Sequence, residues 1–230
     1  MSDAPNRIVV IGAGHAGVEF AVALRHKNFA GSIDLVSDED EVPYQRPPLS
    51  KEYIKRGGQM PPLMLKPEQY FLDNNITLRR GVSVDSVDRN ARTVTLSTGD
   101  VLAYDHLVFA TGARNRVPPV PGLDNPAVLG LRTLADADRL CVEIGRFKRV
   151  AVIGGGFIGL EAAGLLREFE IDVDVIEMAD RLMQRAVSPT MSQWFLEHHR
   201  QSGVRVLLNT QVTKVDFSAE RPKLSLSDGS

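Results

Sequence analysis

Cysteine is the scarcest reactive residue in this chain, because Cys141 is the single one among 230 residues. One cysteine cannot form an intramolecular disulfide, and it cannot supply a CxxC or CxxxxC pair. Redox chemistry through an internal dithiol is therefore excluded for this chain. Cys141 lies on an apolar helical pattern, and we expect it to be a small residue of the core.

An excess of charge of one sign is also missing. Lysine and arginine together number 27 against 29 aspartate and glutamate residues, so the formal net charge is -2. A protein dedicated to nucleic-acid binding normally carries a basic face, which this balance argues against. We therefore expect no nucleic-acid partner.

Long hydrophobic runs are absent as well. No segment approaches the roughly 18 consecutive apolar residues that a membrane-spanning helix needs. The opening residues 1–6 are polar and do not resemble a secretory signal. Hydrophobic residues make up 43% and charged residues 24%, a balance that excludes overall disorder. These features favour a cytoplasmic globular protein without a membrane partner.

A strand–turn–helix pattern, in contrast, occurs twice. Residues 7–11 are a β-branched run, and Gly12-Ala-Gly-His-Ala-Gly17 and an apolar helical stripe follow it. Residues 149–153 repeat the pattern and lead into Gly154-Gly-Gly-Phe-Ile-Gly159. In such a turn the glycines allow a tight bend, a close approach to a pyrophosphate and close helix packing. The following helix N-terminus offers free N–H groups to phosphate, so two copies predict two dinucleotide sites.

Each turn is followed by an acidic residue after the next predicted strand. Asp38 is the expected ribose ligand of the first copy, although Glu39 and Asp40 are alternatives beside it. Glu177 directly follows the second strand, and no basic residue comes immediately after it. A carboxylate accepts hydrogen bonds from a ribose 2′-hydroxyl and repels a 2′-phosphate, so Glu177 favours NADH over NADPH.

The internal repeat extends beyond the glycines. Residues 84–88 and 96–99 recur, with substitutions, as residues 212–216 and 226–229. These repeated segments are expected to form a hairpin in each copy. In the first copy an apolar strand, residues 106–110, follows the hairpin, whereas the second copy ends one residue after Gly229. We therefore expect the second unit to lack its last strand.

These elements predict an α/β fold with two Rossmann-like dinucleotide-binding domains, the first interrupted by the second. We expect the first domain to span residues 1–118 and the second, incomplete at its C-terminal end, residues 119–230. The proline-rich run 117–126 reads as the linker between them.

Four further segments show a family resemblance. They are Pro43-Tyr-Gln-Arg-Pro-Pro-Leu-Ser-Lys51, Leu107-Val-Phe-Ala-Thr-Gly112, Leu131-Arg-Thr133 and Gly156-Phe-Ile-Gly-Leu-Glu161. In this order, together with the two turns, they resemble the FAD-dependent ferredoxin reductases of the rubredoxin and putidaredoxin type, within the pyridine nucleotide-disulfide oxidoreductase superfamily. Apoptosis-inducing-factor-like proteins, monodehydroascorbate reductases and NADH-nitrite reductases share parts of the pattern.

The resemblance implies FAD on the first unit and NADH on the second, with no metal site. It also implies that Lys51 and Glu161 form a catalytic ion pair beside the flavin, where a cation stabilises the reduced ring. The positions that it assigns to cofactor binding are Gly12, Ala13, Gly14, His15, Ala16, Gly17, Asp38, Arg46, Lys51, Val84, Ala110, Thr111, Gly112 and Arg132 for FAD, and Gly154, Gly156, Phe157, Ile158, Gly159 and Glu177 for NADH.

The function that this resemblance implies is transfer of hydride from NADH to FAD and of electrons onward to a ferredoxin-type iron–sulfur protein. A relative with another acceptor is an alternative, and so is a redox-incompetent nucleotide-binding fragment. In the family the chain continues past the second hairpin, so the resemblance also implies C-terminal truncation and weak FAD binding by these 230 residues alone.

The helical pattern near residue 195 carries the remaining expectations. Met191, Trp194 and Phe195 read as core residues of this helix. The neighbouring His198 and His199 point to different sides of a helix and make a poor metal pair.

Overall fold

The computed structural model describes residues 7–59, 61, 63–219 and 221–230. The chain forms two compact units. Unit 1 consists of Met1–Gln45 and Pro62–Arg114, and unit 2 consists of Arg46–Pro61 and Asn115–Ser230. No helix in the described part of the chain is long and apolar enough to cross a membrane.

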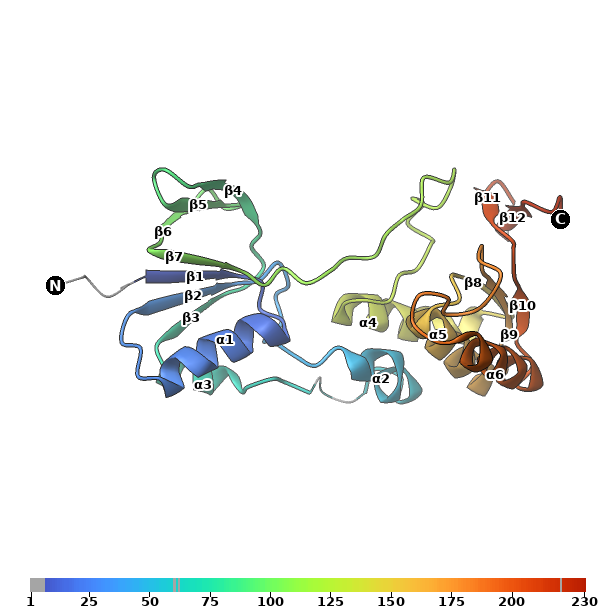
Figure 1. Ribbon diagram of the computed structural model, residues 1–230, viewed down its shortest axis with the longest axis horizontal. Helices are drawn as coiled ribbons and strands as arrows, with labels where there is room; N and C mark the ends of the chain where they lie inside the picture. Colours follow the sequence, from blue (N-terminus) through green and yellow to red (C-terminus); the bar gives the residue numbers. More distant parts are fainter. Residues whose placement is uncertain (1–6, 60, 62, 220) are drawn as a thin grey trace. The chain divides into compact units, whose positions relative to one another are not determined.

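Unit 1 contains a parallel sheet with the strand order β3–β2–β1–β7. Its strands are β1 (Arg7–Ile11), β2 (Ser32–Val36), β3 (Ile76–Arg79) and β7 (His106–Phe109). Helices α1 (His15–His26) and α3 (Glu68–Asp73) cover one face of this sheet (Figure 1). A three-stranded antiparallel layer covers the other face and consists of β4 (Val84–Asp88), β5 (Thr93–Leu96) and β6 (Val101–Ala103).

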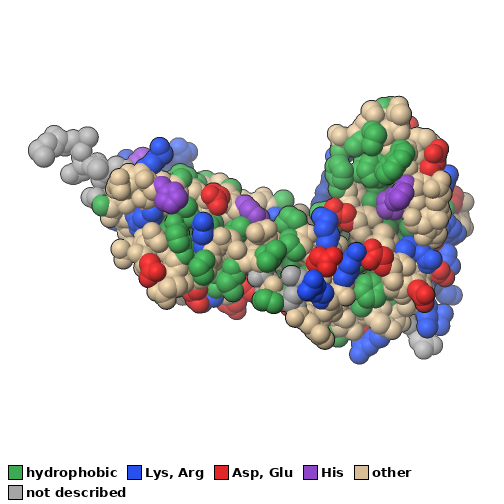
Figure 2. Space-filling view, turned by 90° about the horizontal axis from the view of Figure 1, so that it is seen from below, with side chains coloured by type: hydrophobic (Ala, Val, Ile, Leu, Met, Phe, Trp, Pro, Cys, Tyr) green, Lys and Arg blue, Asp and Glu red, His purple; other side chains and the backbone are tan. Residues whose placement is uncertain are grey.

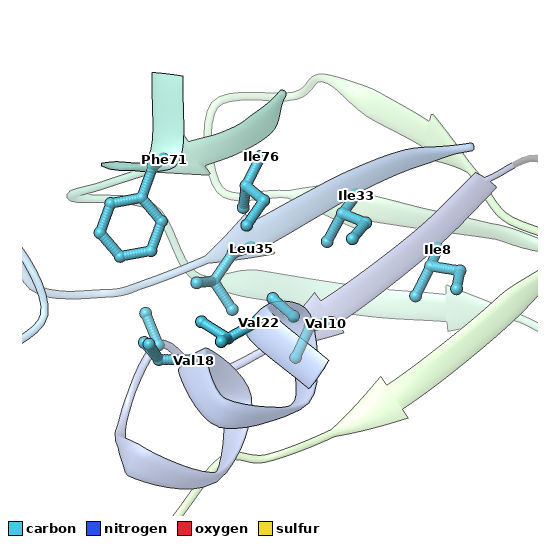
Figure 3. Packing of buried hydrophobic residues seen from close by; sticks show 10 residues of the cluster. Ile8, Val10, Val18, Val22, Ile33, Leu35, Phe71 and Ile76 are labelled. Carbon is cyan, nitrogen blue, oxygen red and sulfur yellow. The ribbon is translucent and has the colours of Figure 1, made fainter. Parts of the chain in front are cut away.

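The core of unit 1 follows from the alternation of side chains along β1. Ile8 and Val10 point toward the helices, and Figure 3 shows them beside Val22 and Ile33. Val9 points to the opposite face and packs in the cluster that includes residues of the antiparallel layer. A strand that is buried on both faces needs a continuous apolar run, which residues 7–11 supply. Burying one such side chain contributes about 1.5–3 kcal/mol.

Unit 2 contains a second parallel sheet with the order β10–β9–β8. Its strands are β8 (Arg149–Ile153), β9 (Asp172–Ile176) and β10 (Arg205–Leu207), and β11 (Val212–Asp216) and β12 (Lys223–Leu226) form a separate hairpin. Its helical segments are η1 (Pro47–Ser50), α2 (Glu52–Lys55), α4 (Leu134–Glu143), η2 (Ile144–Arg146), α5 (Phe157–Glu168) and α6 (Pro189–Gln201).

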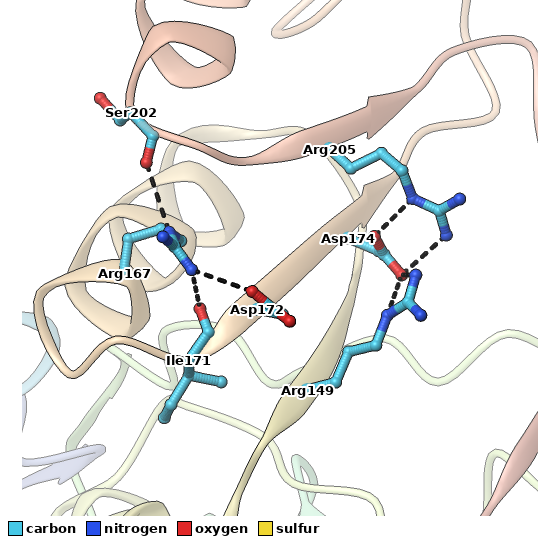
Figure 4. A network of polar contacts seen from close by, with 7 residues as sticks. All are labelled: Arg149, Arg167, Ile171, Asp172, Asp174, Ser202 and Arg205. Carbon is cyan, nitrogen blue, oxygen red and sulfur yellow. Dashed lines mark hydrogen bonds and ion pairs between the residues drawn. The ribbon is translucent and has the colours of Figure 1, made fainter.

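A polar network fixes the register of the second sheet (Figure 4). Asp174 on β9 accepts hydrogen bonds from Arg205 on β10 at 2.6 and 2.9 Å and from Arg149 on β8 at 2.9 Å. Burial alone would raise the pKa of Asp174, but these bonds outweigh it and lower the pKa. Arg167 on α5 donates to the carbonyl of Ile171 at 2.8 Å and ties the helix to the start of β9.

The predicted internal repeat is present in the structure, and the two hairpins share the same irregularity in strand register. Val84 pairs with Leu96 and Val212 pairs with Leu226, and each hairpin shifts register directly after this pair. At the end of each hairpin a backbone N–H donates to the hydroxyl of the serine that directly follows the opposite strand, Ser97 in the first copy and Ser227 in the second. The two units therefore share a local construction as well as a sequence pattern.

The two sheets differ at one edge. In unit 1, β1 lies between β2 and β7, whereas within the described residues β8 pairs with β9 alone. A Cβ atom on Gly12 would lie 2.2 Å from the carbonyl oxygen of Ala110, but one on Gly154 would meet no described atom within 4 Å. Ile153, at the end of β8, is 43% exposed. The counterpart of β7 is therefore not among the described residues of unit 2, as the repeat predicts.

The α/β class with parallel, Rossmann-like sheets is confirmed, but the two units divide the chain differently from the predicted 1–118 and 119–230. Residues 46–61 belong to unit 2, because they pack on α4 and α5. The supposed linker 117–126 also belongs there, since Leu123 is buried against β11 and the carbonyl of Pro121 accepts the Val215 N–H.

The predicted core of α6 is wrong for two of its three residues. Trp194 is 52% exposed and Met191 is 45% exposed, while Phe195 is half-buried. The buried stripe of α6 is Ser192, Leu196 and His199 instead. The polar Ser192 can lie on this stripe because its hydroxyl donates to the carbonyl of Leu182.

Cys141 also differs from the expectation of a core residue, because its side chain is half-buried. Burial, followed by the neighbouring Asp138, raises the pKa of the Cys141 thiol. A thiol with a raised pKa holds less of the reactive thiolate.

Candidate functional site: two phosphate-binding turns and an ion pair

The first glycine turn has a backbone that requires glycine at two positions. Gly12 has a φ of +108°, and its N–H donates to the carbonyl of Val36 at 2.8 Å. A Cβ atom on Gly17 would lie 1.9 Å from the carbonyl oxygen of Gly12, so a side chain there would separate α1 from the turn. These contacts bring the start of α1 to the carboxyl end of β1, as a dinucleotide turn requires.

The same turn also fits a pyrophosphate. A Cβ atom on Gly14 would meet no described atom within 4 Å, so space is open beside the helix start. Gly14 is the N-cap of α1 and has no side chain that could bond the first N–H groups. These N–H groups and the positive end of the helix dipole form an anion site.

The second turn repeats this construction. Gly154 has a φ of +105°, and a Cβ atom on Gly159 would lie 2.1 Å from the carbonyl oxygen of Gly154. Gly156 is the N-cap of α5 and is open in the way that Gly14 is. Phe157 and Ile158 follow it and are 55% and 54% exposed at the start of the helix. Their apolar side chains are thus available beside an anion site.

Glu177 lies directly beside the second turn. One of its carboxylate oxygens accepts the Gly155 N–H at 2.7 Å, and the other accepts the Ala179 N–H at 2.8 Å. These two bonds fix the carboxylate at the carboxyl end of β9. A carboxylate oxygen has lone pairs left for further donors, so the group can still accept from a ribose hydroxyl.

The structural counterpart of Glu177 in unit 1 is Ser37. The Ser37 N–H donates to Arg79 on β3, as the Glu177 N–H donates to Leu207 on β10. Asp38 is the next residue and is exposed. Of its two alternatives, Glu39 accepts a hydrogen bond from Tyr44. Asp38 therefore lies one position beyond the equivalent of Glu177, and its role at a ribose stays a prediction.

The segment after β7 passes beside the first turn. The Ala110 N–H donates to the carbonyl of Ile11 at 2.8 Å, and the Ala110 carbonyl lies against Gly12. Thr111 and Gly112 follow and are exposed. Val84 is half-buried at the first residue of β4. The structure thus brings Ala110 to the turn, whereas a contact of the other positions with a cofactor stays a prediction.

The predicted pair of Lys51 and Glu161 is present within unit 2. The Lys51 ammonium lies 3.2 Å from one oxygen of Glu161, and the Ser50 hydroxyl donates to the other oxygen at 2.7 Å. Lys51 comes from the junction of η1 and α2, and Glu161 comes from α5 one turn after Phe157. The ion pair itself is a structural fact, and its place beside a flavin is a prediction.

Several contacts hold the segment of residues 46–61 on unit 2. Arg46 donates to the carbonyl of Arg132 at 2.9 Å, which brings these two predicted FAD residues together. Lys55 lies 2.8 Å from Glu168, and this contact raises the pKa of Lys55. Tyr53 donates to Asp138, and burial, followed by this hydrogen bond, raises the pKa of Tyr53 to about 12.

The sequence interpretation missed Ser50 and the contact between Lys55 and Glu168. The helical spacing of the two lysines and of the two glutamates could have suggested a second ion pair. It also missed a groove of about 650 Å³ in unit 2 that is lined by residues including Lys51, Lys55, Phe157, Glu161, Trp194 and His198. The His198 ring stacks on Trp194 at 5.1 Å between centroids.

Charged side chains of both signs are interspersed on the face shown in Figure 2. No continuous basic surface is visible on that face, which agrees with the near-neutral net charge of -2. In the described residues, no cluster of histidine, cysteine, aspartate or glutamate has the geometry to hold a metal ion.

The chain matches one family along its length. The family model described as "Pyridine nucleotide-disulphide oxidoreductase" matches residues 6–230. Rhodocoxin reductase of Rhodococcus erythropolis is 47% identical over 93% of this chain and 50% of its own length. A ferredoxin--NAD(P)(+) reductase of a Sphingomonas species is 39% identical over 92% of this chain and 51% of its own length. The chain thus spans about half the length of these relatives.

Solved structures give the same picture. The crystal structure of the ferredoxin reductase for the CYP199A2 system of Rhodopseudomonas palustris has a TM-score of 0.93 and 43% identity, and the match covers 98% of this chain and 56% of that one. The reductase in the covalent putidaredoxin reductase–putidaredoxin complex has a TM-score of 0.88 and 35% identity, with 98% and 55% covered.

Proposed function

Because this chain belongs to the pyridine nucleotide-disulphide oxidoreductase family, we propose that it is part of an enzyme that takes hydride from NADH onto FAD and passes electrons to a ferredoxin-type iron–sulfur protein. The observation that carries the proposal is the combination of two phosphate-binding turns with the ion pair of Lys51 and Glu161. The relatives named above are reductases of ferredoxins or similar carriers, and they support the choice of acceptor.

The residues of unit 1 fit the binding of FAD. The open space at Gly14 and the free N–H groups at the start of α1 suit its pyrophosphate. We infer that Asp38 binds its ribose and that Val84 and Thr111, also in unit 1, contact the rest of the molecule. Arg46, Lys51 and Arg132 belong to unit 2, and their assignment to FAD depends on the family resemblance. When bound, FAD supplies the acceptor for hydride and releases electrons one at a time.

The protein contributes binding, orientation and charge. The Glu177 carboxylate selects a coenzyme with a free 2′-hydroxyl, and the start of α5 binds its phosphates. The Lys51 ammonium would supply a positive charge that stabilises the negative charge of a reduced flavin. Glu161 keeps this charge in place. Hydride transfer then needs no acidic or basic side chain.

The proposal is tested by mixing the purified chain with a large excess of FAD, because binding by these 230 residues is expected to be weak, and separating free flavin in one rapid filtration step. We expect a yellow protein whose flavin absorbance bleaches on addition of NADH under argon, and we expect NADH oxidation with ferricyanide. A panel of small ferredoxins then identifies the acceptor protein. A chain that stays colourless at high FAD concentration would contradict the proposal and would favour a nucleotide-binding fragment. The cytoplasmic location stays a prediction from the sequence.

A further inference from the structure

The Glu161 carboxylate is held by two residues that follow one another in the chain. Lys51 contacts one of its oxygens at 3.2 Å, and the Ser50 hydroxyl donates to the other at 2.7 Å. Both oxygens of the carboxylate are thus engaged, one by a charge and one by a hydroxyl. The resemblance assigns a role to Lys51 and Glu161 but none to Ser50.

The ion pair alone holds its two side chains weakly. The side chain of Lys51 is 51% exposed and that of Glu161 is 38% exposed. Water screens an ion pair at such exposure, and two long flexible side chains lose entropy when they keep one geometry. A hydroxyl that donates to a carboxylate is a short, charge-assisted hydrogen bond and restricts the carboxylate more strongly.

The backbone delivers the Ser50 hydroxyl from a rigid position. Pro47 and Pro48 open the 3₁₀ turn η1 and fix its φ angles, and Leu49 is only 3% exposed. The alternative acceptor, the carbonyl of Pro47, lies 3.4 Å from the Ser50 oxygen. A hydroxyl has one proton, and the carboxylate at 2.7 Å is the stronger acceptor.

We propose that Ser50 is a positioning residue whose hydroxyl orients the Glu161 carboxylate and thereby holds the Lys51 ammonium in place. Ser50 acts through Glu161 and has no contact of its own with the ammonium group in this scheme. The part of the proposal that concerns a flavin depends on the proposed function, but the hold on Lys51 does not.

The hold on Lys51 is measured without any cofactor by trace acetylation of the 230-residue chain. An amine that a carboxylate holds in an ion pair reacts slowly with acetic anhydride, because its nitrogen must leave the carboxylate before it can attack. Mass spectrometry gives the rate at Lys51 relative to Lys148. We expect Ser50→Ala to raise this rate roughly twofold, because part of a surface ion pair is lost, and Ser50→Thr to restore it.

Two further variants make the result specific. Glu161→Gln should raise the Lys51 rate at least as much, and Ser50→Ala should add nothing in that background, because both changes act on one interaction. The matched control is Glu168→Gln, which removes the neighbouring ion pair between the same two segments and should raise the rate at Lys55 but not at Lys51. An unchanged Lys51 rate in Ser50→Ala would overturn the proposal, and so would additive effects of Ser50→Ala and Glu161→Gln.

The FAD-loaded chain separates this inference from the proposed function. In stopped-flow reduction by NADH, we expect Ser50→Ala to slow bleaching about threefold at saturating NADH, with Ser50→Thr near the parent rate. If Ser50→Ala changes acetylation of Lys51 but leaves flavin reduction unchanged, Ser50 still positions Lys51, and the assigned role of the ion pair at the flavin is wrong.

Discussion

At the scale of single residues, the two turns give a matched comparison. Gly12 and Gly154 have nearly the same φ, at +108° and +105°, so a side chain is strained at both. Of these two, only Gly12 faces the backbone that follows β7, because its Cβ position lies 2.2 Å from the carbonyl oxygen of Ala110. The two positions therefore separate the cost of strain from the cost of overlap.

We expect Gly154→Ala to destabilise β8 by about 1–2 kcal/mol, the cost of a left-handed residue with a Cβ atom. Gly12→Ala also displaces the Ala110 carbonyl, so it should destabilise β1 by more than about 3 kcal/mol. Hydrogen exchange of the amides in β1 and β8, measured separately in each variant, gives both values. Equal losses in the two strands would show that the Ala110 contact is unimportant.

His199 provides a pH dependence at the residue scale. Burial, followed by the neighbouring His198, lowers the pKa of His199 below its ordinary value of 6.5. The folded chain therefore favours the neutral ring, and the unfolded chain takes up a proton first as the pH falls. We expect the stability of unit 2 to be complete above pH 6.5 and to decrease below it.

Trp194, the single tryptophan, reports this effect by its fluorescence during urea unfolding. The urea concentration at the unfolding midpoint should decrease as the pH is lowered from about 6.5 to about 5. This window lies above the range where most carboxylates titrate. His199→Gln keeps a polar side chain that does not titrate and should flatten the profile in this window. A profile with the same slope in both proteins would assign the effect to another group.

At the scale of secondary-structure elements, Asp174 joins the three strands of the second sheet. Its side chain is 13% exposed and bonds two arginines on the two neighbouring strands. Asp172, two residues earlier on the same strand, is 78% exposed and contacts Arg167 at 3.3 Å. Both aspartates thus form ion pairs with arginine, but Asp174 is partly buried and Asp172 is exposed to water.

We expect Asp174→Asn to destabilise unit 2 by about 1–3 kcal/mol, because it removes a charge that two arginines share in a partly buried place. Asp172→Asn should cost less than about 1 kcal/mol, since water already screens its contact. Urea unfolding of the two variants at pH 7 measures the difference. The Asp174 effect should shrink in acid, because its lowered pKa contributes stability that is lost as the carboxylate becomes protonated.

At the scale of the whole molecule, we propose that the placement of Glu177 decides which coenzyme the chain accepts. Its carboxylate is fixed beside the second turn by the N–H groups of Gly155 and Ala179. A 2′-phosphate at this place would bring two negative charges together, and the two residues that follow, Met178 and Ala179, carry no positive charge.

We therefore predict that the chain binds NADH at least about tenfold more tightly than NADPH, a difference of roughly 1.4 kcal/mol. Calorimetric titration of the chain with each coenzyme measures the ratio. Glu177→Gln keeps the size of the side chain but removes its charge, and the ratio should decrease. Equal affinities in the parent chain would remove Glu177 from the ribose site.

The sequence by itself determined the features that depend on local backbone geometry. Both turns, the helices after them and the paired hairpins were predicted correctly, because a tight bend needs glycine and a buried strand needs a continuous apolar run. The position of Glu177 beside the second turn follows in the same way, since the end of a strand fixes where its next residue lies, and its role at a ribose stays a prediction. These constraints act within a few residues and are therefore visible in a linear pattern.

The tertiary structure alone decided which distant segments pack together. Residues 46–61 pack with unit 2, and Ser50 bonds a glutamate 111 positions away. The exposure of Trp194 could not be predicted either, because the apolar pattern of α6 permits more than one buried face and the packing of α6 beside β10 selects one of them. Such contacts depend on the shape and spacing of elements that are far apart in the chain. Local propensity does not encode them, since a helix gains most of its stability from whichever surface covers its apolar side.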